Sequence, residues 1–292
     1  MEILKGLKLK KKVIVIASVL VALLGIILIL AFTVFSLKSV EVDFRTSRLN
    51  ITASQEEIIE NSGIKKGGSV FFKGKRGYIE KIEDVNPYIN VINIETVFPS
   101  KFVIHITERQ EIYALPFENG HYICDEELRV LRIDEAYQNT TSNAVVLNTV
   151  NPTSQNDLQA GDYITDVTLP PIYEALFENN CTLGEMTEIV EEITFTSEKN
   201  TTINKEQTVA TLSLYSGQTV RIVNAEYGLV SKVKLMLDVY SQLFEFIGKT
   251  IKTGDGEVVL TEKNLKSCTI EINNYLHPDR TENECYFDLI LN

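Results

Sequence analysis

Hydrophobic residues are spread unevenly along this chain, and the longest uncharged stretch lies close to its first residue. Residues 13–35 are 23 consecutive positions without a charged side chain, rich in Val, Ile, Leu and Ala. A helix rises about 1.5 Å per residue, so such a stretch reaches roughly 35 Å and is long enough to cross a bilayer. The pattern predicts a transmembrane helix over residues 13–37.

A cluster of lysines precedes this stretch and predicts its orientation. The cluster consists of Lys5, Lys8, Lys10, Lys11 and Lys12. Excess lysine marks the cytoplasmic side, so we expect a cytoplasmic basic tail over residues 1–12 and a single-pass type II protein of the cell membrane whose bulk lies outside. A cleaved signal peptide has a shorter apolar core and a small-residue cleavage site, and a buried soluble helix carries polar interruptions. The anchor is favoured over both.

The pattern after residue 38 predicts a unit of strand, helix, helix, strand and strand. The strands are expected at 39–43, 90–97 and 101–109, and the helices at 54–62 and 78–85. Alternation in the last two strands places Ile92 and Ile94 on the face that also carries Phe102, Ile104 and Ile106. His105 falls on the opposite face, where an isolated histidine is usually solvated.

A second unit, rich in strands, follows residue 109. Strands are predicted at 111–115, 121–124, 128–133, 144–147, 189–196, 208–214, 219–223, 267–273 and 285–291, and helices at 172–177 and 229–247. Residues 135–159 are rich in Asn, Thr, Ser and Gln, which is typical of an irregular surface connection. The fold class is α+β: a transmembrane helix, a small strand and helix unit, and a mixed β domain with a long helix and terminal strands.

Several motifs of the first unit resemble the POTRA domain of the bacterial cell-division proteins FtsQ and DivIB. They are Val40-Glu-Val42, Ser62-Gly-Ile64 with Gly68-Ser-Val-Phe71, Asn86-Pro-Tyr-Ile89, and Val97-Phe-Pro-Ser-Lys101 turning into Ile104-His-Ile-Thr-Glu-Arg109. The second unit resembles the following domain of that family more loosely, through Leu212-Ser-Leu-Tyr-Ser-Gly217, Val220 and Lys232-Val-Lys-Leu235.

The resemblance implies a domain plan for the chain. It implies a POTRA domain at 38–109, an FtsQ/DivIB-like β domain at 110–276, and a C-terminal tail or edge strand at 277–292. One departure concerns the turn after Asp125, where the family has a glycine and this chain has Glu126-Glu127.

Composition narrows the classes of partner. The formal net charge of the chain is -12. Residues 1–12 carry five Lys and one Glu, a net charge of +4, so the rest of the chain has a net charge of -16. Such an acidic surface disfavours nucleic acid and other anionic partners. The four cysteines, Cys124, Cys181, Cys268 and Cys285, have no metal-ligand spacing. A Cys268–Cys285 disulfide is conceivable, although four separate thiols are favoured.

No catalytic motif stands out, and the chain is not expected to be an enzyme. The three histidines lie at 105, 121 and 277, outside any HExxH arrangement, and neither GxSxG nor SxxK occurs. We therefore expect no cofactor, no bound metal and no small-molecule substrate. Because the positions of paired carboxylates in a sequence are not diagnostic, a membrane-tethered wall enzyme or sensor stays an alternative. A POTRA-type transport component is a further one, disfavoured because such proteins carry several POTRA copies and a barrel.

The resemblance implies a non-catalytic scaffold of the divisome at the division septum. Its implied partners are other single-span division proteins, of the FtsB/DivIC and FtsL types, and the cytoplasmic membrane itself. We expect binding by strand addition at an exposed sheet edge, because unpaired backbone groups there can pair with an extended peptide. The candidate positions are Ser267, Thr269, Glu271 and Asn273 on one strand and Tyr286, Asp288 and Ile290 on the tail. The alternative is that the tail only completes its own sheet.

Overall fold

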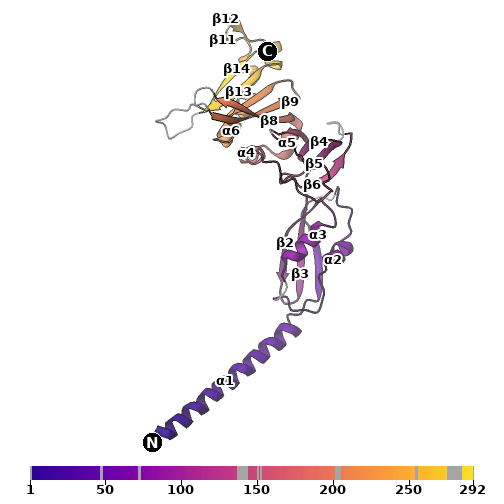
Figure 1. Cartoon of the computed structure of the whole chain (residues 1–292), viewed down its shortest axis with the longest axis vertical. Coiled ribbons are helices and arrows are strands. Elements are labelled where there is room, and N and C mark those ends of the chain that lie inside the picture. Colours follow the sequence, from indigo (N-terminus) through magenta and orange to yellow (C-terminus); the bar gives the residue numbers. More distant parts are fainter. Residues whose placement is uncertain are drawn as a thin grey trace. The chain divides into compact units, whose positions relative to one another are not determined.

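Contacts along the chain divide the computed structural model into two units, Met1–Arg109 and Gln110–Asn292. Figure 1 labels many of the helices and strands of both units. The structure describes residues 2–46, 49–71, 74–136, 144–149, 151, 153–200, 205–253, 256–274 and 285–291.

The first unit begins with the long helix α1, which spans Glu2–Thr33. Its described side chains are Val13, those of residues 15–30, and Thr33. Among the residues that the structure describes, no helix is long and apolar enough to cross a membrane. The lysine cluster before residue 13 lies outside the side chains that are described, so its role in topology stays a prediction.

A three-stranded sheet with two helices completes the first unit. Its elements are β1 (Ser39–Phe44), α2 (Gln55–Asn61), α3 (Arg76–Glu83), β2 (Ile89–Val97) and β3 (Lys101–Glu108). The strand order is β1-β3-β2, with β1 parallel and β2 antiparallel to β3. All five elements agree with the sequence prediction in type and order.

The core of this unit lies between the sheet and its two helices. Ile58 of α2 and Ile82 of α3 are fully buried, and so are Phe102, Ile104 and Ile106 of β3. These three β3 residues alternate along the strand and therefore share one face of the sheet. The predicted inward face of β3 is confirmed.

The predicted position of Ile92 is wrong, because the register of β2 slips beside it. The β2–β3 pairing shifts between Val91 and Asn93, as in a β-bulge. Val91 and Ile94 are consequently both buried, whereas Ile92 is 52% exposed. An extra residue in one strand reverses the facing of the residues beyond it, which strict alternation does not anticipate.

The second unit is built on a sheet of nine strands. The strand order is β14-β13-β10-β9-β8-β7-β4-β5-β6. These strands are β4 (Tyr113–Phe117), β5 (Gly120–Cys124), β6 (Val130–Asp134), β7 (Val145–Asn148), β8 (Val190–Asn200), β9 (Lys205–Leu214), β10 (Thr219–Val223), β13 (Thr269–Asn274) and β14 (Cys285–Ile290). Most neighbours are antiparallel, but β4 with β7, β7 with β8, and β10 with β13 are parallel.

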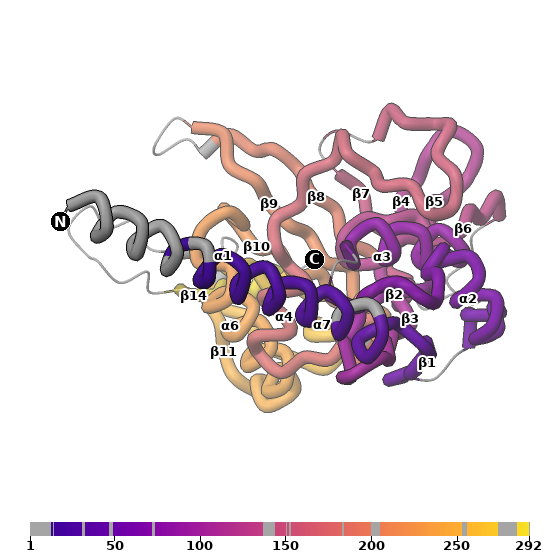
Figure 2. The backbone as a smooth tube through the Cα atoms, turned by 90° about the horizontal axis from the view of Figure 1, so that it is seen from below, coloured from indigo at the N-terminus to yellow at the C-terminus, as the bar shows by residue number. Residues whose placement is uncertain are grey.

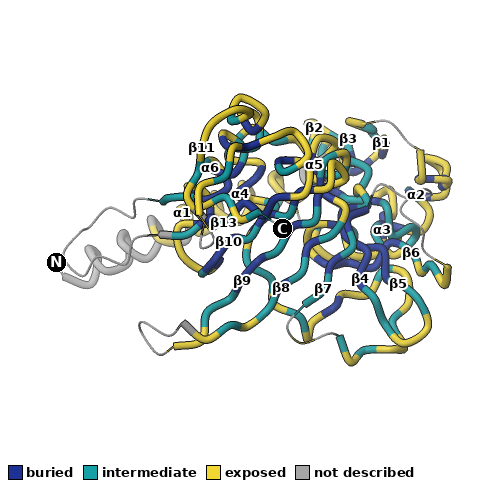
Figure 3. The backbone as a smooth tube through the Cα atoms, turned by 90° about the horizontal axis from the view of Figure 1, so that it is seen from above, coloured by how far each residue is buried: buried dark blue, intermediate teal, exposed yellow. Residues whose placement is uncertain are grey.

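Short helices and a separate hairpin accompany this sheet. They are α4 (Ile172–Glu178), α5 (Leu183–Ile189), α6 (Leu229–Gln242) with the 3₁₀ turn η1 (Leu243–Phe246), the hairpin of β11 (Thr250–Thr253) and β12 (Gly256–Val259), and α7 (Glu262–Lys266). Apolar residues of α4 and α6 form one core with the sheet, including Leu176, Val233 and Met236. β8 and β9 form a long hairpin (Figure 2), and the described residues of it beyond the core are exposed or partly exposed (Figure 3).

Two short helices and the β11–β12 hairpin were not predicted from the sequence. Capping boxes start both helices: Thr182 with Glu185 for α5, and Thr261 with Asn264 for α7. In each box the threonine side chain accepts the backbone N–H of the residue three positions later. The side chain of that later residue accepts the backbone N–H of the threonine. The threonine and its partner three residues later were therefore a readable signal for both helices.

The turn after Asp125 forms without the glycine that the family pattern has there. Oδ1 of Asp125 accepts the backbone N–H groups of Glu127, at 3.0 Å, and Arg129, at 2.9 Å. Leu128 takes the left-handed conformation, with φ of 61°, that glycine ordinarily supplies. The aspartate side chain thus holds together a turn whose backbone is unfavourable for leucine.

Candidate functional site

The outermost strand of the second sheet on one side is β14, and it makes the candidate binding edge. β14 pairs antiparallel with β13, from Thr269 opposite Ile290 to Asn274 opposite Cys285. β13 in turn pairs with β10, so it has a neighbour on both sides. Within the described residues no strand lies beyond β14.

This topology changes the assignment of the predicted binding residues. Thr269, Glu271 and Asn273 belong to an interior strand, so the expectation that their strand offers an open edge is wrong while β14 is paired. Ser267 precedes that strand as the C-cap of α7. The tail does complete its own sheet, and in doing so it becomes the edge itself. Binding by either set of residues stays a prediction.

The two faces of β14 differ. Phe287 and Leu289 pack against the core of the second unit, and the rings of Phe287 and Phe246 meet edge-on with centroids 6.1 Å apart. Asp288 and Ile290 alternate with them, and Ile290 is 44% exposed. One face of the strand is therefore anchored, while the other face and the outer edge are accessible.

Charged residues tie together the strands next to this edge. Arg221 of β10 donates to both carboxylate oxygens of Glu198, at 3.1 Å each, and to Glu271 of β13, at 3.1 Å. The arginine lowers the pKa of Glu198 by these hydrogen bonds, which outweigh the opposing effect of burial. A bidentate arginine fixes geometry as well as charge, so this triad helps to hold β13, the neighbour of β14, in the sheet.

The cysteines at this edge are not close to each other. Cys268 lies immediately before Thr269, which is opposite Ile290, whereas Cys285 is opposite Asn274. Their positions along the pair are therefore six residues apart, or roughly 20 Å at about 3.3 Å per residue. All four cysteines of the chain are free thiols, and the conceivable Cys268–Cys285 disulfide does not form.

His105 lies in a cluster of charges on the open face of the first unit's sheet. Its Nδ1 is 2.9 Å from Oδ2 of Asp43 and its Nε2 is 3.0 Å from Oε2 of Glu95. Arg45 also contacts Asp43, with Nε 2.7 Å from Oδ2. His105 is buried, so the expectation of a solvated side chain is wrong. Side-chain partners at both ring nitrogens explain this, because Asp43 and Arg45 contact Nδ1 and Glu95 contacts Nε2.

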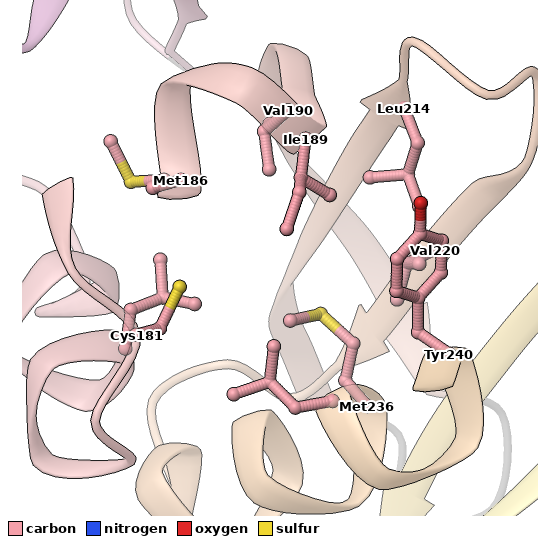
Figure 4. Close-up of a pocket in the computed structure, with 10 residues that line it drawn as sticks. Cys181, Met186, Ile189, Val190, Leu214, Val220, Met236 and Tyr240 are labelled. Atoms are coloured by element: carbon pink, nitrogen blue, oxygen red, sulfur yellow. The ribbon is translucent and has the colours of Figure 1, made fainter. Parts of the chain in front are cut away.

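A narrow apolar pocket lies beside α5 and α6 in the second unit. Figure 4 shows Ile189 and Met236 on opposite sides of it, and Cys181, Met186 and Tyr240 also line it. Burial raises the pKa of the Cys181 thiol, which lowers the fraction of the nucleophilic thiolate. The pocket consequently has the character of core packing and provides no groups for acid–base chemistry.

The described residues also contain no group of three or more His, Cys, Asp or Glu side chains placed to hold a metal ion. What the site offers is a strand edge and a charged sheet face, and both suit contact with another protein. The geometry thus defines a protein with a small sheet and helix module followed by a larger β unit with an accessible edge.

Comparison with known families agrees with the first module. Residues 35–109 match the family described as the POTRA domain, FtsQ-type. The part of the first unit that follows α1 is therefore a POTRA domain of the FtsQ type.

Similar proteins carry the same indication. The cell division protein DivIB of Clostridium botulinum strain Hall is 30% identical over 130 residues, which are 44% of this chain and 48% of that protein. DivIB of Clostridium tetani is 31% identical over 121 residues, or 41% of this chain and 43% of that protein. The matched region spans less than half the length of these relatives. The matches support the FtsQ/DivIB family, as the motifs predicted.

Proposed function

We propose that this chain is a non-catalytic scaffold of the bacterial divisome, which binds other single-span division proteins outside the cytoplasmic membrane at the septum. The observation that carries the proposal is the FtsQ-type POTRA domain at residues 35–109, directly after an apolar helix. The names of the DivIB relatives support a role in cell division. The partners implied by the family resemblance are of the FtsB/DivIC and FtsL types.

The proposal includes a membrane anchor formed by α1. The large apolar side chains described between Val13 and Leu30 are 43–69% exposed. A helix that exposes apolar groups on all sides is unfavourable in water and favourable in lipid. With the lysine cluster on the cytoplasmic side, the POTRA domain and the second unit lie outside the cell membrane.

Partner binding is proposed to occur by strand addition at β14. An extended segment of a partner pairs with the outer edge of β14, and side chains such as Asp288 and Ile290 contribute to specificity. Anchoring both proteins in one membrane raises their effective concentration, so a modest interface suffices.

Depletion of the protein tests the cellular role. Cells should become filamentous, and a fluorescent fusion should collect at mid-cell. Normal division after depletion, or a fusion spread evenly around the envelope, would contradict the role in septum formation.

Proline substitution at each position from Phe287 to Ile290 tests the edge. Along an edge strand the N–H groups alternate between the sheet and the outside. Proline at the two positions that point outward should abolish retention of a DivIC-like partner and change thermal stability little, because proline removes a donor that the sheet does not use. Proline at the other two should lower stability.

The opposite edge of the sheet provides the matched control. β6 is the outermost strand there among the described residues, and the same substitutions at Arg132 and Ile133 should leave retention unchanged. Retention that survives all four β14 variants would exclude this edge from the partner interface.

A further inference from the structure

Three phenylalanines form an exposed cluster where the chain leaves α1 and enters the POTRA domain. We call Phe35, Phe71 and Phe98 the aromatic cluster. The ring centroids of Phe35 and Phe71 are 5.0 Å apart, those of Phe71 and Phe98 5.5 Å, and those of Phe35 and Phe98 6.2 Å. Each ring therefore contacts the other two, although they come from three separate segments.

Despite these contacts the cluster remains open on its outer side. Phe71 is 53% exposed and Phe98 is 60% exposed. Val34, which precedes Phe35, and Val97, which precedes Phe98, are exposed as well. A patch of this kind is unfavourable in water and marks a surface that meets another apolar medium.

The backbone fixes the cluster to the end of α1. α1 ends at Thr33, and the carbonyl of Phe35 accepts the N–H of Val70 at 2.9 Å. Leu37 donates to Gly68 at 2.9 Å, its carbonyl accepts from Gly67, and its side chain is fully buried. The segment after α1 is thus part of the POTRA fold and is not a free linker.

This attachment limits how far the cluster can lie from the end of α1. Phe35 lies two positions after Thr33, and a chain extends at most about 3.6 Å per residue, so the reach is about 7 Å. The headgroup region on each side of a bilayer is about 5–8 Å thick, from a total of about 40–45 Å around a core of about 30 Å. If α1 spans the membrane, the cluster lies within or directly beside the headgroup layer.

Lysines adjoin the same segments in an otherwise acidic protein. Lys38 follows the α1 exit, and Lys65 and Lys66 precede the loop that carries Phe71. All three are exposed. Lysine is attracted to an anionic bilayer surface, so these positions favour a lipid surface over an apolar protein groove.

We propose that the aromatic cluster inserts into the outer headgroup region of the membrane and holds the POTRA domain against the bilayer. Amphipathic surfaces with phenylalanine and lysine bind at this depth. The proposal rests on α1 being a membrane anchor. It adds a second membrane contact, made by the exported domain itself.

The absence of tryptophan from the chain makes a direct test possible. The full-length protein is reconstituted in vesicles of phosphatidylcholine and phosphatidylglycerol, with or without lipids brominated near the headgroup end of the acyl chain. Single variants Phe98→Trp and Phe71→Trp each introduce one indole into the cluster. Quenching by bromine and a shift of emission to shorter wavelength report insertion.

Two further variants serve as references. Leu49→Trp places the indole at a site that is 83% exposed, where the backbone N–H of Leu49 meets Glu108 at the far end of β3 from the cluster. Leu24→Trp places it in the middle of α1, and for this variant lipids brominated deeper in the chain are used.

We expect quenching for Phe98→Trp, Phe71→Trp and Leu24→Trp, and none for Leu49→Trp. If Leu24→Trp is quenched while both cluster variants resemble Leu49→Trp, the anchor holds and the insertion of the cluster is refuted. If Leu24→Trp is not quenched, the anchor itself fails and the insertion fails with it.

Discussion

The ammonium group of Lys232 lies 2.7 Å from the main-chain oxygen of Val223 and equally far from that of Asn224. The lysine belongs to α6 and both acceptors to the end of β10 and the turn after it. Lys232 is fully buried, and burial lowers its pKa to about 8. A cation with two charge-assisted hydrogen bonds thus ties the longest helix of the second unit to its sheet.

The first prediction concerns the pH dependence that Lys232 introduces. In the unfolded chain its pKa returns to the usual 10.5. Between about pH 8 and 10.5 the unfolded state therefore binds more protons, and this lysine's contribution to the free energy of unfolding rises with pH, by about 1–3 kcal/mol. Lys232→Met should remove that rise, as measured by urea unfolding of the detergent-solubilised chain at several pH values.

Comparison with a variant of an exposed lysine isolates the effect of Lys232. Lys234→Met changes an exposed residue of the same helix and should keep the pH dependence of the unmodified chain. Equal pH profiles for Lys232→Met and Lys234→Met would show that the buried ammonium is not the source.

The second prediction concerns the charge cluster of the POTRA sheet. His105→Ala removes the group that lies between the carboxylates of Asp43 and Glu95. Because these carboxylates are 44% and 58% exposed and water can solvate them, the loss should lower the free energy of unfolding by only about 0.5–1.5 kcal/mol. Ile92→Ala on the neighbouring strand is the control, and because Ile92 is exposed it should change stability by no more than about 0.5 kcal/mol.

The third prediction concerns the turn between β9 and β10. Gly217 has φ of 95°, and a Cβ atom there would lie 2.7 Å from the main-chain oxygen of Lys266. Gly217→Ala should therefore destabilise the protein by about 1–3 kcal/mol. Gly184 lies in α5 with nothing within 4 Å of its would-be Cβ. Gly184→Ala should instead stabilise by about 0.5–1 kcal/mol, and thermal unfolding of both variants checks the contrast.

The fourth prediction concerns the thiols. Cys124 and Cys268 are buried, and burial raises the pKa of both, so maleimide should label them only after unfolding. Cys181 and Cys285 are partly exposed and should react first. Mass spectrometry without reductant should count four reactive thiols in denaturant. A pair that reacts only after reduction would contradict the free thiols.

The hydrophobic periodicity of the sequence was sufficient to predict most of the helices and strands. It did not always predict which face of a strand a residue occupies. Alternation along β3 predicted the burial of Phe102, Ile104 and Ile106. It failed at Ile92, because a bulge depends on how two strands pair and leaves no mark in the spacing of one of them. α5 was missed because it is only seven residues long, which is too short for a clear helical period.

The candidate edge shows a similar limit. The composition of both β13 and β14 predicted strands, and both exist. Which of them is the outer strand depends on the pairing of β13 with β10, some fifty residues earlier in the sequence. No local property of Thr269 or Glu271 distinguishes an interior strand from an edge. The position of the candidate site within the sheet therefore needed the structure.

The pairing of β10 with β13 also bears on the order of folding. These strands are parallel and distant in sequence, and contacts of that kind form late because a long loop must close first. Among the described strands β14 pairs with β13 alone, so its edge becomes part of the nine-stranded sheet only when that closure has occurred. A partner that recognises this edge within the complete sheet would therefore bind the protein only after the second unit has folded.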